Sequence, residues 1–199
     1  MLRELRPAIV LLALLTIVTG LAYPIALTGI SQVLFPSQAN GSQVEVGGKI
    51  VGSALIGQNF TDAKYFHGRP SATSDTDPKD PTKTVPAPYN AMNSAGSNLG
   101  PTSQALSDRV KADIATLQAE NPGVPVPADL VTTSASGLDP DISPEAAAFQ
   151  APRISKERKL PLATVQSLIQ QQTKGRLFGL LGEPRLNVLA LNIALDTQR

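Results

Sequence analysis

Residues 7–35 read PAIVLLALLTIVTGLAYPIALTGISQVLF, and this stretch decides how the rest of the chain is organised. No Asp, Glu, Lys, Arg or His occurs from Pro7 through Val44. A bilayer core of about 30 Å requires roughly 20 mostly apolar residues in a helix, because only a helix satisfies its own backbone in lipid. The sequence therefore predicts one transmembrane helix over 7–35, in which Pro24 causes a kink or a loosened turn.

A cleaved signal peptide is the alternative interpretation of this segment. The basic start, the apolar core and the small residues of Gly20-Leu21-Ala22 all fit a signal sequence. The apolar character continues beyond Tyr23-Pro24 as far as Leu34, which is longer than a signal core, so we favour an uncleaved anchor. Small residues let helices approach closely in lipid, and we therefore expect Gly20 and Gly29 to pack against a partner helix.

Charges on either side of the apolar segment predict its orientation. Arg3 and Arg6 precede it, and the first charge after it is Glu45. Under the positive-inside rule, residues 1–6 lie in the cytoplasm and everything after the helix lies outside. We expect a Pro/Ser/Gly/Asn-rich connector over 36–49 and one soluble extracytoplasmic domain over 50–199.

The composition limits what this domain does. The chain carries 17 basic and 16 acidic residues, and this balance gives no electrostatic footprint for nucleic acid. It contains no cysteine, which excludes disulfides and thiol chemistry, and no tryptophan. The 150 residues of 50–199 are enough for one compact core, and their mixed patterns predict a small α+β fold.

Apolar periodicity and turn residues predict the elements of this domain. Ser143 is the expected N-cap of a helix that Pro152 breaks or kinks, and the basic residues of 153–159 are expected to form a solvated face. Residues 71–101 lack periodicity and read as a long loop that is either mobile or functional. We expect strands over 48–60 and 129–133, helices over 102–120, from 144 to about 150 and from 161 to 174, and over 186–195 a buried strand with a helix as the rival.

No motif for catalysis or metal binding is complete. Gly48-Lys49 is followed by Ile50, so a phosphate-binding P-loop fails. His67 is the only histidine and has no nucleophile motif to serve, so we interpret it as part of a loop packed on the core. Asp139 and Asp141 resemble the start of a calcium loop but lack the EF-hand glycine and glutamate. We therefore predict no catalytic residue, no metal site and the role of an accessory subunit.

Five short motifs in a fixed order give the chain a more specific resemblance. The motifs are Gly52–Gln58, Tyr65-Phe66 with Arg69–Ala72, Gly96–Pro101, Ser134–Pro140 with Ile142-Ser143, and Asn187–Leu189 with Leu191-Asn192. Together they resemble KdpC, the C subunit of the bacterial potassium-transporting P-type ATPase, over nearly the whole chain. Small departures are Ala95, where a glycine is common, and Asp141, where a histidine is common.

The resemblance implies a place in an inner-membrane complex. Its expected partners are a channel-like subunit that binds potassium, a P-type ATPase subunit that hydrolyses ATP, and a very small membrane subunit. The family role implied is assembly of the complex and catalytic chaperoning that raises the ATP affinity of the ATPase subunit. The family links the glutamine after the Ser-Pro-Glu helix, Gln150 in this chain, to transient ATP binding; the alternative is a helix-end side chain that bonds the backbone near Pro152. A binding or assembly module unrelated to transport is the other function that an anchor with these loops allows.

The predicted orientation conflicts with direct contact between Gln150 and cytoplasmic ATP, and it suggests a different role for the domain. Neutral oxygen-rich loops over the outer entrance to an ion path would tolerate a passing hydrated cation without trapping it. Carboxylates beside them would modestly enrich potassium. The residues expected in these loops are Asn93, Ser97, Asn98, Ser134, Ser136, Asp139 and Asp141.

Overall fold

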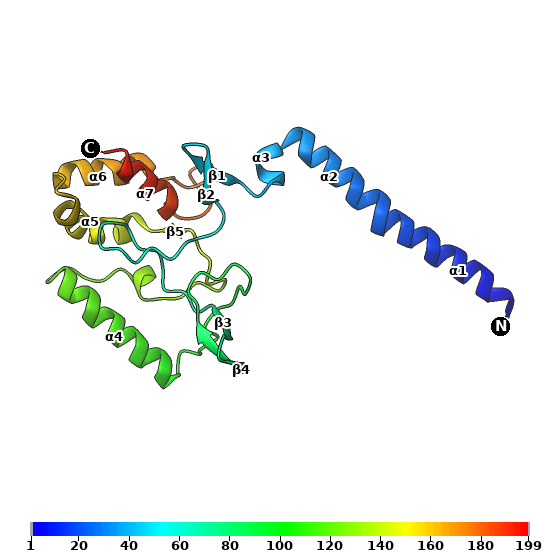
Figure 1. The fold of residues 1–199 in the computed structure, drawn as a ribbon, viewed down its shortest axis with the longest axis horizontal. Helices are drawn as coiled ribbons and strands as arrows, with labels where there is room; N and C mark the ends of the chain where they lie inside the picture. Colours follow the sequence, from blue (N-terminus) through cyan, green and yellow to red (C-terminus); the bar gives the residue numbers. More distant parts are fainter. Residues whose placement is uncertain (1, 199) are drawn as a thin grey trace. The chain divides into compact units, whose positions relative to one another are not determined.

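The computed structural model describes residues 2–198, and the chain divides into two compact units, Met1–Ser53 and Ala54–Arg199 (Figure 1). The first unit consists of an apolar helix and a small hairpin. The second is a mixed domain of helices and short antiparallel strand pairs. The expectation of a small α+β domain behind a single apolar helix is confirmed in this form.

The apolar helix is nearly continuous. It comprises α1 (Leu2–Ile17), one π-helical turn (Val18–Ala22) and α2 (Tyr23–Leu34). In the described part of the chain it is the one helix long and apolar enough to cross a membrane, judged by length and composition. Pro24 has no amide hydrogen for the helical ladder, and the wider π turn just before it accommodates this loss.

The predicted connector over 36–49 folds instead of remaining irregular. It contains α3 (Pro36–Ala39) and β1 (Gln43–Val46), and β1 pairs antiparallel with β2 (Lys49–Ser53). Gly47 and Gly48 both adopt positive φ, which lets two glycines close the hairpin without steric cost. Ser53 Oγ donates to the carbonyl of Gly41 at 2.7 Å, so the end of β2 is tied to the chain just before β1.

Three helices form the core of the second unit. They are α5 (Pro144–Arg158), α6 (Leu162–Gln172) and α7 (Val188–Asp196), which lie together in Figure 1. The side chain of Ser143 caps α5 as expected. The fully buried large side chains include Phe66, Ile154, Val165, Leu186, Leu191 and Leu195.

The prediction of a strand over 186–195 is wrong, and its rival helix is correct. Only β6 (Leu186–Asn187) is extended, and it pairs with β5 (Asp141–Ile142). Asn187 then accepts a hydrogen bond from the amide of Ala190 at 3.0 Å and so starts α7. A continuous apolar run carries neither helical nor strand periodicity, and the cap decides between them.

Two further predictions from local patterns are wrong. Residues 129–133 do not form a strand, because Asp129 accepts hydrogen bonds from both the amide and the hydroxyl of Ser143 and the chain curls into a 3₁₀ turn, Ala128–Leu130. Helix α5 continues through Pro152 to Arg158 instead of ending near Gln150.

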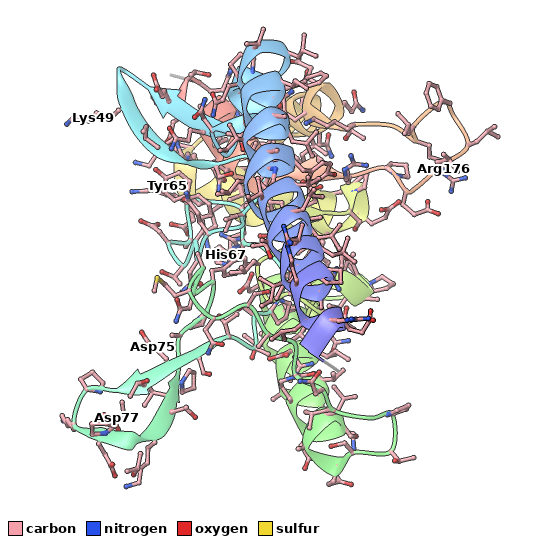
Figure 2. The ribbon with its side chains drawn as sticks, turned by 90° about the vertical axis from the view of Figure 1, so that its right-hand side faces the viewer. Lys49, Tyr65, His67, Asp75, Asp77 and Arg176 are labelled. Carbon is pink, nitrogen blue, oxygen red and sulfur yellow. The ribbon has the colours of Figure 1, made fainter. Side chains whose placement is uncertain are left out.

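The remaining elements are α4 (Gln104–Glu120), as predicted from its apolar stripe, and a hairpin inside the long 71–101 loop. The hairpin pairs β3 (Ser74–Asp77) with β4 (Asp80–Pro86), and it carries Asp75 and Asp77 away from the core (Figure 2). Its residues are mostly polar, so apolar alternation could not reveal it.

The buried carboxamide of Asn192 holds Phe66 on this core. Phe66 is completely buried, and its amide donates to Oδ1 of Asn192 at 2.8 Å. Nδ2 of Asn192 donates to the carbonyl of Phe66 at 3.0 Å. A single side chain on α7 therefore satisfies both backbone groups of a residue outside any ladder, where unpaired groups would be costly.

We expect Asn192→Leu to lower the free energy of unfolding by about 2–5 kcal/mol, because two buried backbone groups of Phe66 lose their partners. Chemical unfolding of the full chain in detergent, followed by the near-ultraviolet circular dichroism of its tyrosines, measures this loss. The matched control is Gln166→Leu on the exposed face of α6. Equal stability of the two variants would contradict the role given to Asn192.

Candidate functional site

The candidate site is built around the loop Ser134–Pro140, called the hub loop below. Its backbone carbonyls accept hydrogen bonds from four other segments, each within or next to one of the five motifs. Gly137 has φ +66°, and a Cβ there would meet a Thr73 methyl at 2.5 Å, so only glycine fits this close approach. The bonds are Gly57 N to Leu138 O at 2.8 Å, Ser71 Oγ to Gly137 O at 2.7 Å, Ala95 N to Ser136 O at 3.0 Å and Val188 N to Pro140 O at 2.9 Å.

An ion pair links the hub loop to the second motif. Arg69 Nη1 lies 2.8 Å from Asp139 Oδ2, and both side chains are about one quarter exposed, 26% and 27%. The guanidinium also donates to the carbonyls of Thr132 and Thr133 at 3.4 Å. Asp139 Oδ1 accepts a hydrogen bond from the amide of Asp141 at 3.0 Å. The carboxylate of Asp139 therefore binds both Arg69 and the backbone just after the hub loop.

Tyr89 fills the space behind this ion pair. Its hydroxyl donates to the carbonyl of Arg69 at 2.7 Å, and burial raises the pKa of the phenol to about 12. Its ring lies so close to Gly57 and Gly68 that a Cβ at either glycine would meet Tyr89 within 2.4 Å. Tyr89 itself adopts φ +61°, an uncommon conformation for a bulky residue that its surroundings hold in place.

The structure brings the two predicted oxygen-rich loops, 93–98 and 134–139, side by side. Most of their polar groups are used internally. Ser94 Oγ and the amide of Ala95 both donate to the carbonyl of Ser136. The individual contacts are Asn93 Nδ2 to Ser74 O at 2.8 Å, Thr133 Oγ1 to Ser97 Oγ at 3.3 Å, Gly137 N to Ser134 Oγ at 2.9 Å and Leu138 N to Ser136 Oγ at 3.1 Å, while Asn98 takes a positive φ of 52°.

Both predicted carboxylates have cationic partners. Asp139 pairs with Arg69, and Asp141 Oδ2 lies 3.0 Å from Nε of Arg185. Burial raises the pKa of the Asp141 carboxyl, against the opposing effect of Arg185. The two acids therefore add little net negative charge to this surface, which removes the physical basis for potassium enrichment by them.

Gln150 is buried at the centre of α5 and holds the residue next to Phe66. Its Oε1 accepts from the amide of His67 at 2.8 Å, and its Nε2 donates to the carbonyl of His67 at 3.1 Å. Nε2 also lies 3.3 Å from the carbonyl of Ala146, and Arg153 Nη2 donates to Oε1 at 2.8 Å. Its backbone partners are thus His67 and Ala146, not the groups near Pro152 that one alternative predicted.

Two arginines that were expected on a solvated face instead hold the segment before Phe66. The side chains of Arg153 and Arg158 are only 13% and 14% exposed. Arg153 donates to the carbonyls of Ala63 and Tyr65 and pairs with Glu120 on α4, while Arg158 donates to the carbonyl of Lys64 and pairs with Asp196. Burial lowers the pKa of Arg153. No local pattern signals this role, because the carbonyl partners of the two arginines lie 88 to 94 residues away in sequence.

A cleft of about 510 Å³ is lined by α4 on one side and by residues 59–61 and 67–71 on the other. His67, Arg69, Tyr89, Asp113, Glu120 and Gln150 are among its lining residues. Within residues 2–198 no group of three or more His, Asp or Glu side chains is placed to hold a metal ion. Among the lining residues, the polar side-chain atoms of Gln150, Arg69 and Tyr89 already bond to other groups of the protein.

Comparison with known proteins decides the family. The family model described as "KdpC: K+-transporting ATPase, c chain" matches residues 5–197. The chain belongs to the KdpC family. The resemblance predicted from the five motifs is thereby confirmed, and the hub loop explains physically why those motifs occur together.

Curated relatives agree with this family assignment along the full chain. A protein of Bradyrhizobium diazoefficiens named potassium-transporting ATPase KdpC subunit is 68% identical over 196 residues, 98% of each chain. Proteins of the same name from Rhodopseudomonas palustris strain BisB18 and Methylobacterium nodulans are 65% and 66% identical, covering 100% and 98% of each chain. The similarity includes the apolar helix as well as the second unit.

A double-mutant cycle with Arg69→Met and Asp139→Asn tests the ion pair of the hub loop. We expect a coupling of about 1–2 kcal/mol in the free energy of unfolding, because both groups are largely shielded from water. The control is the same cycle on the Lys83–Asp80 pair, at 2.9 Å on the exposed hairpin, where solvent screening makes the expected coupling smaller. A coupling at Arg69–Asp139 no larger than this control would refute the assignment.

His67 gives the chain a testable pH dependence. Burial and the nearby Arg153 lower the pKa of the imidazole below its ordinary 6.5, against the weaker opposing effects of Glu120 and Asp62. The unfolded state therefore binds a proton at higher pH than the folded state. We expect the free energy of unfolding to fall as the pH drops through 6.5, and His67→Gln to remove this part of the slope. Unfolding titrations between pH 8 and 5.5 measure it; an unchanged slope in the variant would contradict it.

Proposed function

We propose that the chain is a non-catalytic accessory subunit of an ATP-driven potassium-uptake complex in the bacterial inner membrane. The observation that carries the proposal is the full-length similarity to KdpC subunits, from the apolar helix to the last motif. The partners proposed are a channel-like potassium-binding subunit, a P-type ATPase subunit and a very small membrane subunit. The chain assembles and stabilises this complex.

The apolar helix is proposed as the anchor and as the first contact with these partners. A Cβ added at Gly20 or Gly29 would meet nothing within 4 Å, so both glycines leave open space for another helix. Arg3 and Arg6 at its start favour a cytoplasmic N-terminus and an extracytoplasmic second unit. In that orientation the paired loops 93–98 and 134–139 would contact the outer side of the channel-like subunit.

The effect of the chain on ATP is proposed to be indirect. The side-chain amide of Gln150 forms hydrogen bonds with His67, Ala146 and Arg153, and the residue is only 3% exposed. This favours a structural role over contact with nucleotide. A correctly held second unit would stabilise the high-affinity state of the ATPase subunit through contacts between subunits. ATP is then a ligand of the partner, and the chain acts as a catalytic chaperone without binding ATP itself.

Affinity purification through a C-terminal tag, after membranes are dissolved in a mild detergent, tests the proposal. We expect a large P-type ATPase and a channel-like subunit to co-purify with the chain, and potassium-stimulated ATPase activity to show a lower KM for ATP when the chain is present. Gly20→Leu and Gly29→Leu should reduce recovery of the partners several-fold by blocking close helix packing. Ala8→Leu, a similar enlargement near the start of the helix, is the matched control.

Recovery of the chain without any ATPase would overturn the proposal and favour the other function that the anchor allows, a binding or assembly module unrelated to transport. Recovery of the complete complex with an unchanged KM for ATP would retain the assembly role and remove the chaperone role.

A further inference from the structure

Residues 174–185 form a narrow hairpin, called the apolar loop below. Its base is closed by two backbone hydrogen bonds between Lys174 and Arg185, at 2.8 and 3.0 Å. Nearer the tip, the amide of Leu177 donates to the carbonyl of Leu181 at 2.9 Å. Phe178 and Gly179 turn the chain with positive φ values of 54° and 73°. These bonds define an ordered projection, and Figure 2 shows its Arg176 standing away from the helices of the second unit.

The tip of the apolar loop is uncovered. Its four large side chains are 60% (Leu177), 85% (Phe178), 80% (Leu180) and 61% (Leu181) exposed. A Cβ added at Gly175, Gly179 or Gly182 would meet nothing within 4 Å, so no other part of the described chain packs against these three glycines. Four neighbouring apolar side chains in water are unfavourable and indicate a surface that is covered in the working protein.

We propose that the apolar loop inserts its tip into the surface of the lipid bilayer, at the boundary between headgroups and acyl chains. Between Leu177 and Leu181 no side chain carries a polar atom. Protein interfaces surround an apolar centre with paired polar groups and fit it to a shaped partner, whereas lipid accepts a convex apolar tip without such pairing. The composition of the tip therefore favours lipid.

Charge at the base of the loop supports the same occupant. The loop contains three basic residues, Lys174, Arg176 and Arg185, and one acid, Glu183, which lies 2.6 Å from Arg176. Arg185 pairs with Asp141 outside the loop, so these five side chains together carry one net positive charge. With the apolar tip among the acyl chains, these cations would reach the level of the lipid phosphates. An apolar tip above a basic base matches the polarity of a membrane surface.

The length of the tether keeps the loop within reach of the membrane. Asn187, two residues after the base of the loop, donates through Nδ2 to the carbonyl of Ala54 at 3.0 Å. Ala54 follows the last residue of the apolar helix, Leu34, by 20 positions (54 − 34), which limits their separation to about 70 Å even if fully extended. The inference rests on the proposed membrane anchor, but it does not depend on potassium transport.

Single-cysteine variants test this, because the native chain contains no cysteine. Phe178→Cys, Ile25→Cys and Met92→Cys, each labelled with a polarity-sensitive fluorophore, are reconstituted as full chains in nanodiscs of phosphatidylcholine with phosphatidylglycerol. Ile25 reports on the apolar helix, and Met92, 95% exposed in the second unit, is the aqueous control. The measurements are quenching by aqueous iodide and by nitroxide-labelled lipid.

We expect iodide to quench the label at position 178 several-fold less than the label at 92, and nitroxide lipid to quench 178 and 25 but not 92. Equal iodide quenching at 178 and 92, with position 25 still in lipid, would overturn the loop proposal and leave the anchor intact. Iodide access at 25 as well would instead refute the anchor. If the label at position 178 is protected from iodide only after the partner subunits are added, the lipid proposal is overturned and a protein surface covers the tip instead. Equal thermal unfolding midpoints for the three variants control for misfolding.

Discussion

Two buried carboxamides hold the segment on which the second unit depends. Asn192 on α7 forms hydrogen bonds with both the amide and the carbonyl of Phe66. Gln150 on α5 forms hydrogen bonds with the same two groups of His67. A carboxamide carries one acceptor and two donor hydrogens, so it satisfies a peptide unit as a neighbouring strand would. Phe66 and His67 belong to no strand, and without these side chains their backbone groups would be buried without partners.

The rest of the arrangement follows from this fixed point. Because Phe66 is fixed in the core and His67 is bound by Gln150, Arg69 lies where it pairs with Asp139. Ser71 lies where it donates to the carbonyl of Gly137. Arg153 and Arg158 donate hydrogen bonds to the backbone carbonyls of the preceding residues, 63–65. Arg153 also links this segment to α4 through its ion pair with Glu120. The hub loop is thus held by backbone amides and by the side chains of Ser71 and Arg69, all from segments far apart in sequence. This dependence explains why glycines and small polar residues, instead of reactive groups, dominate the motifs.

Local signals predicted the parts of this structure that local interactions determine. The apolar helix follows from its composition, α4 follows from its apolar stripe, and the start of α5 follows from Ser143, whose hydroxyl caps it. The run 186–195 could not be assigned, because a segment that is apolar except at Asn187 and Asn192 fits a buried strand and a buried helix equally well. The clamp was beyond sequence reasoning, since Gln150 lies 83 residues from His67. Family resemblance reached the right segments, but only the structure shows that they converge on one loop.

The distribution of satisfied and uncovered groups bears on how such a subunit acts. Around the hub loop and the cleft, the polar side chains of Gln150, Arg69, Tyr89 and Ser134 bond to other groups of the chain, which fits the proposed role of an accessory subunit. The large uncovered surfaces are apolar instead, along the helix and at the tip of the apolar loop. A protein built this way contributes free energy by burying surface against neighbours, and a shift in a partner's equilibrium requires only that this burial differ between the partner's states. Rigidity then matters more than reactivity, and the clamps on Phe66 and His67 supply it.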